Sequence, residues 1–587
     1  MDIRENTAEK NPWRRPLLVL GSSMALTGAI LLYSLGGEGS FLRARALLNN
    51  TSYYFMAALC ACWVYALLRV LDKAGRQPIR ECLSVNKWGI AAALALSALI
   101  FVSVKPQIRV LSDEANLVGV SKSMFMAHKS NILTQARWVD GEFVVARTVP
   151  DKRPMLFPFA INILHVFTGY RMANAYALNF ICTFVYLALV FCVARAFLGG
   201  MAGIAAMLFT ASYPLFNLCA TSAGFETFSL LFLGLSLLAF YRYLKNPEQE
   251  EFAFFWGTLC MYSYTRYECG AVFAVLFLLV LQWRVLRPDH FRPAWFYFLA
   301  PLLFLPMLWQ RLALKLVENP EYSSAFSLSV VPLHLTELFY YFLSFSYRLP
   351  YAAVLNLAFL IALALMALRA AGLKPSLLPQ FQRRFLWGLG LSFAALLSIW
   401  MLYHFKLVYS GPTSARIFLP LCALAALSPL AIALYIRSVR PVMLLAFSML
   451  TFVIYLPLSL YNVHQERLGL PRQMRYVQEL MRDYDGHNFL LITTRPGHFV
   501  IHDYGAVDYI YARARAKQLM EDLLKRRYSD IFVLQEISLN TGRPTKESVP
   551  PDGFSLEPFF EREFKEGLLM RLSRVVPDPE FNNDAQN

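Results

Sequence analysis

The stretch WGIAAALALSALIFVSV, residues 88–104, decides the fold class of this chain. It contains no charged side chain, and its length suits a helix that crosses a hydrocarbon core of about 30 Å. A helix also satisfies its own backbone hydrogen bonds in lipid. Asp113 and Glu114 follow shortly after this stretch. Because carboxylates at a membrane boundary are costly to place and are usually functional, this pair is the first candidate site.

The composition extends this conclusion to the whole chain. Of its 587 residues, 57% are hydrophobic and only 16% are charged. Apolar runs of roughly 17 to 25 residues, the length of a membrane span, recur along most of the sequence. The chain is therefore predicted to be a polytopic membrane protein, and a soluble protein is excluded.

Hydropathy predicts about thirteen spanning helices. They cover residues 17–35, 53–71, 88–104, 173–194, 200–218, 225–243, 252–264, 271–283, 295–313, 352–368, 385–403, 418–435 and 442–460. The seventh and eighth of these segments are short for a spanning helix. Together the segments predict an all-α membrane domain over residues 1–462.

Basic residues set the orientation of these spans. The segment before the first span is basic, and Lys73 and Arg76 lie between the second and third spans. Lys and Arg are enriched in cytoplasmic loops, so the N-terminus is predicted to be cytoplasmic. Alternation then places residues 105–171 outside, and an odd number of spans also places everything after Asn462 outside. No cleavable signal peptide is predicted, because no small-residue cleavage site follows the first span.

The formal net charge of +16 does not indicate a nucleic-acid-binding protein. Topology and anionic lipid explain the basic residues of the cytoplasmic loops, whereas those outside need another partner. The nine cysteines are scattered and lack a redox or metal-ligand spacing such as C-x-x-C. Buried apolar cysteine is therefore predicted.

Residues 105–171 form an outer segment that is too long for a simple turn. The spacing of apolar residues predicts an amphipathic helix over residues 116–128 and a more apolar helix over residues 154–167, both at the membrane surface. The stretch between them suits a phosphate-bearing lipid head group, because Lys and Arg pair well with phosphate oxygens. Its charged residues are Arg137, Asp140, Glu142, Arg147, Asp151, Lys152 and Arg153.

Further polar side chains gather at the outer ends of later spans. They are Glu226, Arg266, Glu268, His404, Lys406 and Arg416. Carboxylates can serve in acid–base chemistry or hold a metal, and cations can bind a phosphate. For any single residue, a charge that marks the end of a span is the preferred interpretation. For Asp113, Glu226 and Arg416 together, a membrane-embedded site that opens outward is the better one.

The order of these motifs resembles the first outer loop of the GT-C glycosyltransferases. After an outgoing span the chain has Ser112-Asp113-Glu114-Ala115, then an amphipathic helix, then Arg153-Pro154-Met155-Leu156-Phe157-Pro158. The most similar patterns are those of the lipid A aminoarabinose transferases, the protein O-mannosyltransferases and the rhizobial galacturonosyltransferase-like proteins. The resemblance covers most of the membrane part and implies a GT-C-like domain whose first outer loop, residues 105–171, is catalytic.

The resemblance also implies an activity: transfer of a sugar from a polyprenyl phosphate on the outer face of a bacterial inner membrane. In that family an acidic residue of the first outer loop is catalytic, and this position corresponds to Asp113, with Glu114 as its neighbour. Glu226 corresponds to a second acidic position, so Asp113, Glu114 and Glu226 are the catalytic candidates. Lys152 or Arg153 stands where relatives carry a Lys-Pro-Pro motif that meets the lipid phosphate, and the departure from that motif leaves the choice between them open.

The resemblance assigns the remaining charges to substrate binding. Arg416, in the sequence Arg-Ile-Phe-Leu-Pro, resembles a late arginine that binds phosphate. The other candidates are Arg266, Glu268, His404 and Lys406. One carboxylate would take the acceptor proton while cations stabilise the departing lipid phosphate, and the acceptor is a lipid, a glycan or a protein. Some members use a divalent cation, but no cofactor is required, and His128 and His165 are expected to be ordinary polar contacts.

After Asn462 the composition changes to that of a soluble domain. A small α/β domain outside the membrane is predicted over residues 463–577, with strands at 488–493, 530–535 and 567–575 and a helix at 511–526. The polar tail, residues 578–587, is predicted to be disordered.

Two other functional classes compete with a glycosyltransferase. A transporter or lipid flippase would also have many spans and intramembrane charges, but it would usually show internal repeats and broken helices near the midplane. Here the acidic groups are predicted at the outer boundary instead. No pairing between the two halves of the sequence is visible. A binding protein with the same fold but no activity is the second alternative, because a fold alone does not prove function.

Overall fold

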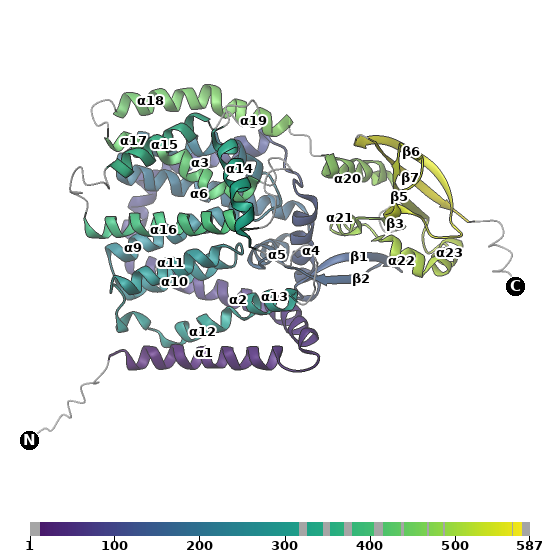
Figure 1. Ribbon diagram of the computed structural model, residues 1–587, viewed down its shortest axis with the longest axis horizontal. Helices are drawn as coiled ribbons and strands as arrows, with labels where there is room; N and C mark the ends of the chain where they lie inside the picture. The colour runs from purple at the N-terminus through teal and green to yellow at the C-terminus, as the bar shows by residue number, and fades with distance from the viewer. Residues whose placement is uncertain are drawn as a thin grey trace, which may run out of the picture.

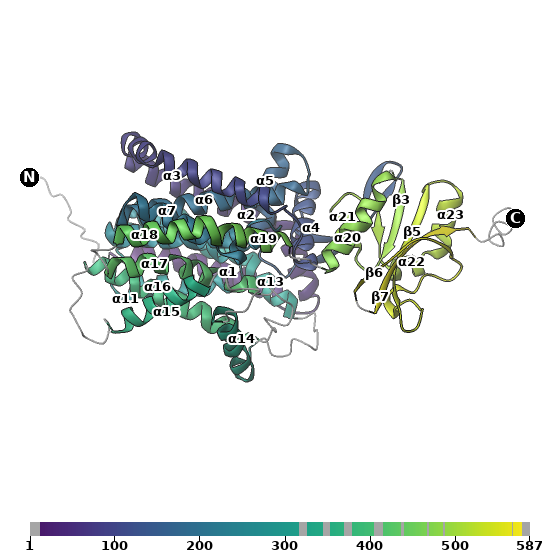
Figure 2. The ribbon, with the colours of Figure 1, turned by 90° about the horizontal axis from the view of Figure 1, so that it is seen from above.

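A helical bundle and a sheet domain lie side by side along the long axis of the molecule (Figures 1 and 2). The computed structural model describes residues 12–315, 326–343, 353–368, 379–403, 415–435, 440–465, 469–484, 488–565 and 567–577. The predicted outer segment contributes elements to both parts. It contains α4 (Leu111–Ala127), β1 (Asn131–Val139), β2 (Glu142–Pro150) and α5 (Leu156–Thr168).

Every predicted span overlaps a helix or a broken pair of helices. In chain order these are α1 (Arg14–Leu35), α2 (Ser40–Ala74), α3 (Arg76–Ser103), α6 (Ala173–Leu198), α7 (Gly200–Ala211) with α8 (Pro214–Ala220), α9 (Glu226–Lys245), α10 (Gln249–Ser263), α11 (Cys269–Gln282), α12 (Ala294–Leu303) with α13 (Leu305–Lys315), α15 (Ala353–Leu368), α16 (Gln380–Leu402), α17 (Leu419–Tyr435) and α18 (Arg440–Leu450) with α19 (Leu456–Gln465). Among the described residues, 8 helical segments are long and apolar enough to cross a membrane, or up to 9 if each bent pair is one span. The chain is an integral, multi-pass membrane protein, although helix length alone does not confirm the count of about thirteen.

Proline breaks two of the predicted spans. α12 and α13 are separated at Phe304, with Pro301 and Pro306 on either side. α18 and α19 are joined by a π-helical turn, Thr451–Tyr455, and Pro457 follows it. Because proline lacks an N–H group, it removes a helical hydrogen bond in each place. A third span is bent by 75° between α7 and α8, and the next loop leads to the N-terminus of α9.

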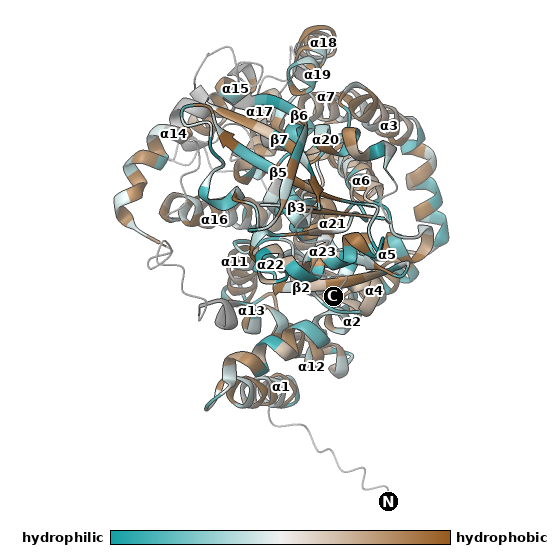
Figure 3. Cartoon of the chain, turned by 90° about the vertical axis from the view of Figure 1, so that its right-hand side faces the viewer, coloured by the Kyte–Doolittle hydropathy of each residue, from teal (hydrophilic) through white to brown (hydrophobic). Residues whose placement is uncertain are grey.

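The outer helices of the bundle turn apolar side chains outward. In α1 the buried positions include Ser23, Thr27 and Ser34, whereas Leu17 and Leu32 are 60% and 77% exposed. Small and polar residues typically pack between membrane helices, because lipid solvates the apolar side chains. Figure 3 shows a mostly brown ribbon for α18, another helix at the edge of the bundle. The bundle is therefore built to be surrounded by lipid.

The sheet domain contains one seven-stranded sheet in the order β2-β1-β4-β3-β5-β7-β6. Its central strands β4 (Ala506–Val507), β3 (Phe489–Thr493) and β5 (Asp530–Ser538) are parallel. β7 (Leu568–Val576) and β6 (Ser555–Lys565) extend the sheet in antiparallel fashion. The three predicted strands correspond to β3, β5 and β7. The small α/β domain after the membrane part is thus present, with more strands than the sequence predicts.

Two strands of this sheet come from the predicted outer segment, which the sequence analysis does not anticipate. β1 and β2 form an antiparallel hairpin, and β1 pairs with β4 through Ala136 and Ala506. Asp140 and Gly141 make the turn, with φ values of 50° and 82°. An Asp-Gly pair with both φ values positive forms the turn that best suits a two-residue hairpin. Most of the charged stretch therefore lies in the sheet domain, and only residues 151–153 lie close to Asp113.

The two helices predicted in the outer segment are present, but α4 is largely buried and does not leave one face to water. It is enclosed between the bundle and the sheet domain (Figure 1), and Leu117, Val120 and Met124 are fully buried. The prediction of a surface helix is wrong here, because the sheet domain covers the face that the amphipathic pattern would leave to water. α5 does expose apolar side chains, including Phe167, which is 81% exposed.

The remaining differences from the predicted elements are local. The helix predicted at residues 511–526 is interrupted at Arg515 and forms α22 (Tyr509–Ala514) and α23 (Ala516–Leu524). Additional helices are α14 (Val331–Leu343), α20 (Gly469–Leu480) and the short α21 (Pro496–Val500). The predicted disordered tail, residues 578–587, lies outside the described residues.

Candidate active site

Charged side chains from distant parts of the sequence meet beside α4. They are Asp113 on α4, Arg153 before α5, Glu226 at the start of α9, Arg266 between α10 and α11, and Arg416 on the short helix η6 (Ala415–Phe418). Arg416 and Asp113 are 303 positions apart in the sequence. We refer to these five residues as the charged cluster.

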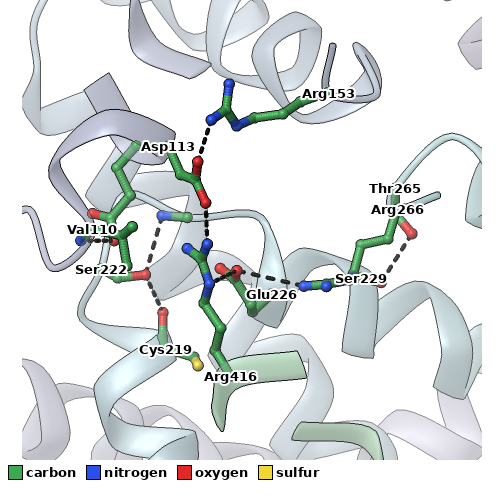
Figure 4. Close-up of polar contacts among 12 residues, drawn as sticks. Val110, Asp113, Arg153, Cys219, Ser222, Glu226, Ser229, Thr265, Arg266 and Arg416 are labelled. Atoms are coloured by element: carbon green, nitrogen blue, oxygen red, sulfur yellow. Dashed lines mark hydrogen bonds and ion pairs between the residues drawn. The ribbon is translucent and has the colours of Figure 1, made fainter. Parts of the chain in front are cut away.

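Asp113 lies between two arginines. Its Oδ1 accepts a hydrogen bond from Arg153 Nη2, and its Oδ2 accepts one from Arg416 Nη2 (Figure 4). Burial raises the pKa of Asp113, but the positive charges of Arg416 and Arg153 outweigh burial and hold the pKa below its ordinary value. The side chain remains 24% exposed. Asp113 is thus an ionised carboxylate that still reaches the surface of the cluster.

Glu226 shares one of these arginines. Arg416 Nε lies 3.3 Å from Glu226 Oε1, and Arg266 Nη1 lies 3.5 Å from the same oxygen. Arg266 Nε in turn donates a hydrogen bond of 2.6 Å to Glu268 Oε1. Arg416 therefore bridges the two carboxylates Asp113 and Glu226, as Figure 4 shows.

The loop before Glu226 is held by hydrogen bonds from neighbouring helices. Asn179 Nδ2 donates to the carbonyl oxygens of Ser222 and Gly224, each at 2.8 Å. A Cβ atom on Gly224 would lie 2.2 Å from Glu226 Oε2, so a larger residue at this position would displace the Glu226 carboxylate. Close approach of the backbone to the Glu226 carboxylate thus depends on this residue.

Arg153 is fixed from behind by a carboxylate and an amide. Asp151 Oδ1 accepts hydrogen bonds from Arg153 Nη1 at 2.9 Å and from the Arg153 backbone N–H at 3.1 Å. Gln310 Nε2, on α13, donates to the carbonyl oxygens of Asp151 and Arg153 at 2.7 and 2.6 Å. Gln310 is only 3% exposed, so water does not compete for these bonds. The broken span α12–α13 thereby positions Arg153.

Replacing Gln310 should therefore destabilise the protein. Gln310→Leu removes both amide hydrogen bonds and leaves two carbonyl oxygens without them, which we expect to lower the free energy of unfolding by about 2–4 kcal/mol. Thermal unfolding of the purified protein in detergent measures this loss. Gln282→Leu is the matched control, because Gln282 is exposed on α11. Equal melting temperatures for the two variants would contradict the prediction.

Glu114 lies beside Asp113 in the sequence but points elsewhere. Its Oε2 accepts hydrogen bonds from the backbone N–H groups of Arg109 at 3.0 Å and Ala223 at 2.9 Å, and its Oε1 accepts one from Val110 at 3.0 Å. The residue is 1% exposed. Burial raises its pKa to about 7, although these N–H groups oppose the rise. Glu114 joins the start of α4 to the loop before Glu226.

We propose that Glu114 has this structural role rather than a catalytic one. Glu114→Gln places an amide NH₂ group against backbone donors, so at least one buried N–H loses its acceptor, at a cost of about 1–3 kcal/mol. We expect a lower melting temperature, whereas Glu142→Gln, at an exposed position of the same segment, should leave it unchanged. A Glu114→Gln protein with a normal melting temperature and no activity would support catalysis instead.

The structure places the other predicted substrate-binding residues in different environments. Arg153 contacts Asp113, whereas its neighbour Lys152 is exposed. Arg266 and Glu268 pair with each other at the edge of the charged cluster. His404 and Lys406 lie outside the described residues.

The sequence analysis does not single out two residues that position the charged cluster. It does not name Gln310, and it includes Asp151 only as one member of the charged stretch. Gln310 carried a usable signal, because a polar side chain inside an apolar span usually has a function or a partner. Asp151 had no local signal that distinguishes it from the other charges around it.

The described residues include no group of three or more His, Cys, Asp or Glu side chains that could hold a metal ion. His165 lies between Ser121 Oγ, at 3.2 Å, and Asn174 Nδ2, at 2.7 Å. His128 packs against Tyr53, with ring centroids 4.5 Å apart and ring planes tilted by 36°. The two histidines thus have separate partners, and Asp113 and Glu226 face arginines.

Comparisons with known proteins bear on the membrane part. Residues 152–310 match a protein-family model described as dolichyl-phosphate-mannose-protein mannosyltransferase. The matched range includes Arg153, Glu226 and Arg266 of the charged cluster. No curated protein matches the sequence.

Several solved structures are similar to this chain. ArnT from Cupriavidus metallidurans bound to undecaprenyl phosphate is 13% identical, with a TM-score of 0.51, and the match covers 84% of this chain and 99% of ArnT. The Archaeoglobus fulgidus oligosaccharyltransferase in complex with Zn and sulfate is 12% identical, with a TM-score of 0.40, over 78% of this chain and 73% of that protein. The family match over residues 152–310 and the fold shared with ArnT make the chain similar to the GT-C superfamily of membrane glycosyltransferases.

Proposed function

We propose that the protein transfers a sugar from a polyprenyl phosphate to a lipid, glycan or protein acceptor, and that the charged cluster is its active site. The observation that carries this proposal is the position of Asp113, an accessible carboxylate between Arg153 and Arg416. The ligand of the similar ArnT structure, undecaprenyl phosphate, supports a lipid-phosphate donor. The family description, which names a dolichyl-phosphate sugar, supports the same class of donor.

The chemistry requires one base and several cations. The acceptor hydroxyl gives its proton to Asp113 as its oxygen bonds to the anomeric carbon. The bond between that carbon and the phosphate oxygen breaks, and the lipid phosphate leaves with the electron pair. Arg153 and Arg416 stabilise the charge that develops on the phosphate. Glu226 does not touch the reacting atoms in this scheme but holds Arg416 in place.

The donor itself activates Asp113 in this scheme. Without donor, both arginines neutralise Asp113 and lower its pKa, which makes it a poor base. When the donor phosphate binds Arg153 and Arg416, it competes with Asp113 for their N–H groups. Asp113 then loses the charges that lower its pKa and becomes able to accept a proton.

We further propose that this site faces the outside of a bacterial inner membrane, with a cytoplasmic N-terminus and the sheet domain outside. The basic residues around Lys73 and Arg76 support this orientation. The sheet domain and α4 lie at the same end of the bundle (Figure 2), so both would face the same compartment.

Transfer by purified protein in proteoliposomes tests the function. Vesicles carry a polyprenyl phosphate with a radiolabelled sugar, and lipid, glycan and peptide acceptors are supplied in turn. We expect label to appear on one acceptor class together with an equal amount of free polyprenyl phosphate. Movement of the labelled lipid between leaflets without transfer would favour a flippase, a function compatible with the bent α7–α8 span.

A further inference from the structure

The sheet domain is built onto the helix that carries Asp113. Its sheet includes the hairpin β1–β2, which follows α4 directly in the chain. Trp138 on β1 donates a hydrogen bond of 2.8 Å from Nε1 to the carbonyl oxygen of Asp503. α21 packs against both α4 and β1. The loop after α21 is therefore held against α4.

A buried lysine lies at the centre of this contact. Lys122 on α4 is 2% exposed, and its Nζ donates to the carbonyl oxygen of Val500 at 2.7 Å and to Asp503 Oδ1 at 2.6 Å. The ammonium group also lies 3.9 Å from the ring centroid of Phe143 and 4.8 Å from that of Tyr170. An ammonium group is costly to bury unless it is paired. These contacts therefore fix the Lys122 side chain in one position.

A neutral hydrogen-bond network beside Lys122 fixes α4 to the bundle. Ser121, next to Lys122, contacts His165 of α5, which contacts Asn174 at the start of α6. α4 is therefore held between the bundle and the sheet domain. Asp113 and Lys122 lie on this one continuous helix, roughly 14 Å apart at 1.5 Å per residue. A change in the anchoring at Lys122 would be transmitted to Asp113 by the helix.

We propose that Lys122 is a positioning residue for Asp113 and that the sheet domain completes the active site through it. This inference rests on the proposed function. Lys122 does not contact the charged cluster in the described structure, so it would act only through the orientation of α4. A misplacement of about 1 Å at a reacting group can cost on the order of 100-fold in rate, so loss of this anchor should affect turnover.

Lys122→Met tests the proposal, because methionine keeps much of the side-chain volume and removes the charge. We expect kcat to fall about 10- to 100-fold, with little change in the KM for the donor, because the arginines that bind phosphate are untouched. Lys122→Arg, which keeps the charge, should recover part of the loss. Lys525→Met is the matched control, since Lys525 forms an exposed ion pair with Glu521 in the sheet domain.

A second variant and a structural readout keep the test decisive if Lys122→Met does not fold. Asp503→Asn changes a half-exposed side chain, 51% exposed, and leaves the ammonium group without its counter-charge. Either variant should increase hydrogen exchange in residues 111–127 while exchange in α6 stays unchanged. The inference is overturned if the wild type is active and the two variants have the same kcat and the same hydrogen exchange as Lys525→Met. A wild type that transfers no sugar would overturn the proposed function instead.

Discussion

Asp113→Asn should reduce sugar transfer by about 10²- to 10⁴-fold, the usual contribution of a general base. Asparagine is close in size but keeps only one acceptor oxygen, so one of the two arginines, Arg153 or Arg416, keeps its hydrogen bond and the other faces the amide NH₂ group. It cannot take the acceptor proton. The donor should bind at least as tightly as before, because a neutral amide competes less with phosphate for the two arginines. Single-turnover transfer and binding of polyprenyl phosphate are the two measurements.

Asp140→Asn provides the control for this substitution. Asp140 is an exposed residue in the same segment of the chain, and its positive φ of 50° suits asparagine. We expect normal transfer and normal donor binding. Asp113→Asn with the turnover of the control would exclude Asp113 as the base. Asp113→Asn with weaker donor binding would show that the carboxylate holds the arginines in place rather than competing for them.

The helices of the bundle could be predicted because lipid imposes simple rules on sequence. A span needs about 20 apolar residues and a continuous helix, so residues 88–104 and their counterparts stand out. The hairpin β1–β2 was harder to see, because its charges suggested a head-group site. Asp140-Gly141 between alternating residues was a usable turn signal. The pairing of β1 with β4 had no such signal, because it joins Ala136 to Ala506.

The charged cluster could be predicted only in part, because its contacts also join residues that are far apart in the sequence. Topology places Asp113, Glu226 and Arg416 on one side of a membrane, and the structure brings them into contact. Sequence could not decide between Lys152 and Arg153, because neighbours in a loop point in different directions. Nor could it separate Glu114 from Asp113, since the donors to Glu114 include the backbone of Ala223. Such long-range hydrogen bonds appear only in the folded chain.

Arg416→Met should change donor binding in the opposite direction to Asp113→Asn. Arg416 is the side chain shared by Asp113 and Glu226, so its loss removes one cation from the phosphate site and leaves each carboxylate one arginine. A hydrogen bond to a charged group contributes about 1.5–3 kcal/mol, so polyprenyl phosphate should bind about 10- to 100-fold more weakly. Transfer should fall further than binding, because the cation also stabilises the leaving phosphate. Arg416→Lys should recover little, since a point charge cannot bridge two carboxylates as a planar guanidinium does.

The control for Arg416→Met is the same substitution at Arg571, which pairs with Glu561 in the sheet domain. It also breaks an arginine–glutamate pair but lies outside the charged cluster, so donor binding should stay at the wild-type level. The opposite signs at Asp113 and Arg416 separate two explanations for any loss of activity. General destabilisation of the protein would weaken donor binding in both variants. If the Asp113 carboxylate and the donor phosphate compete for the Arg416 guanidinium, donor binding weakens only in Arg416→Met. Equal weakening of donor binding in both variants would rule out that competition.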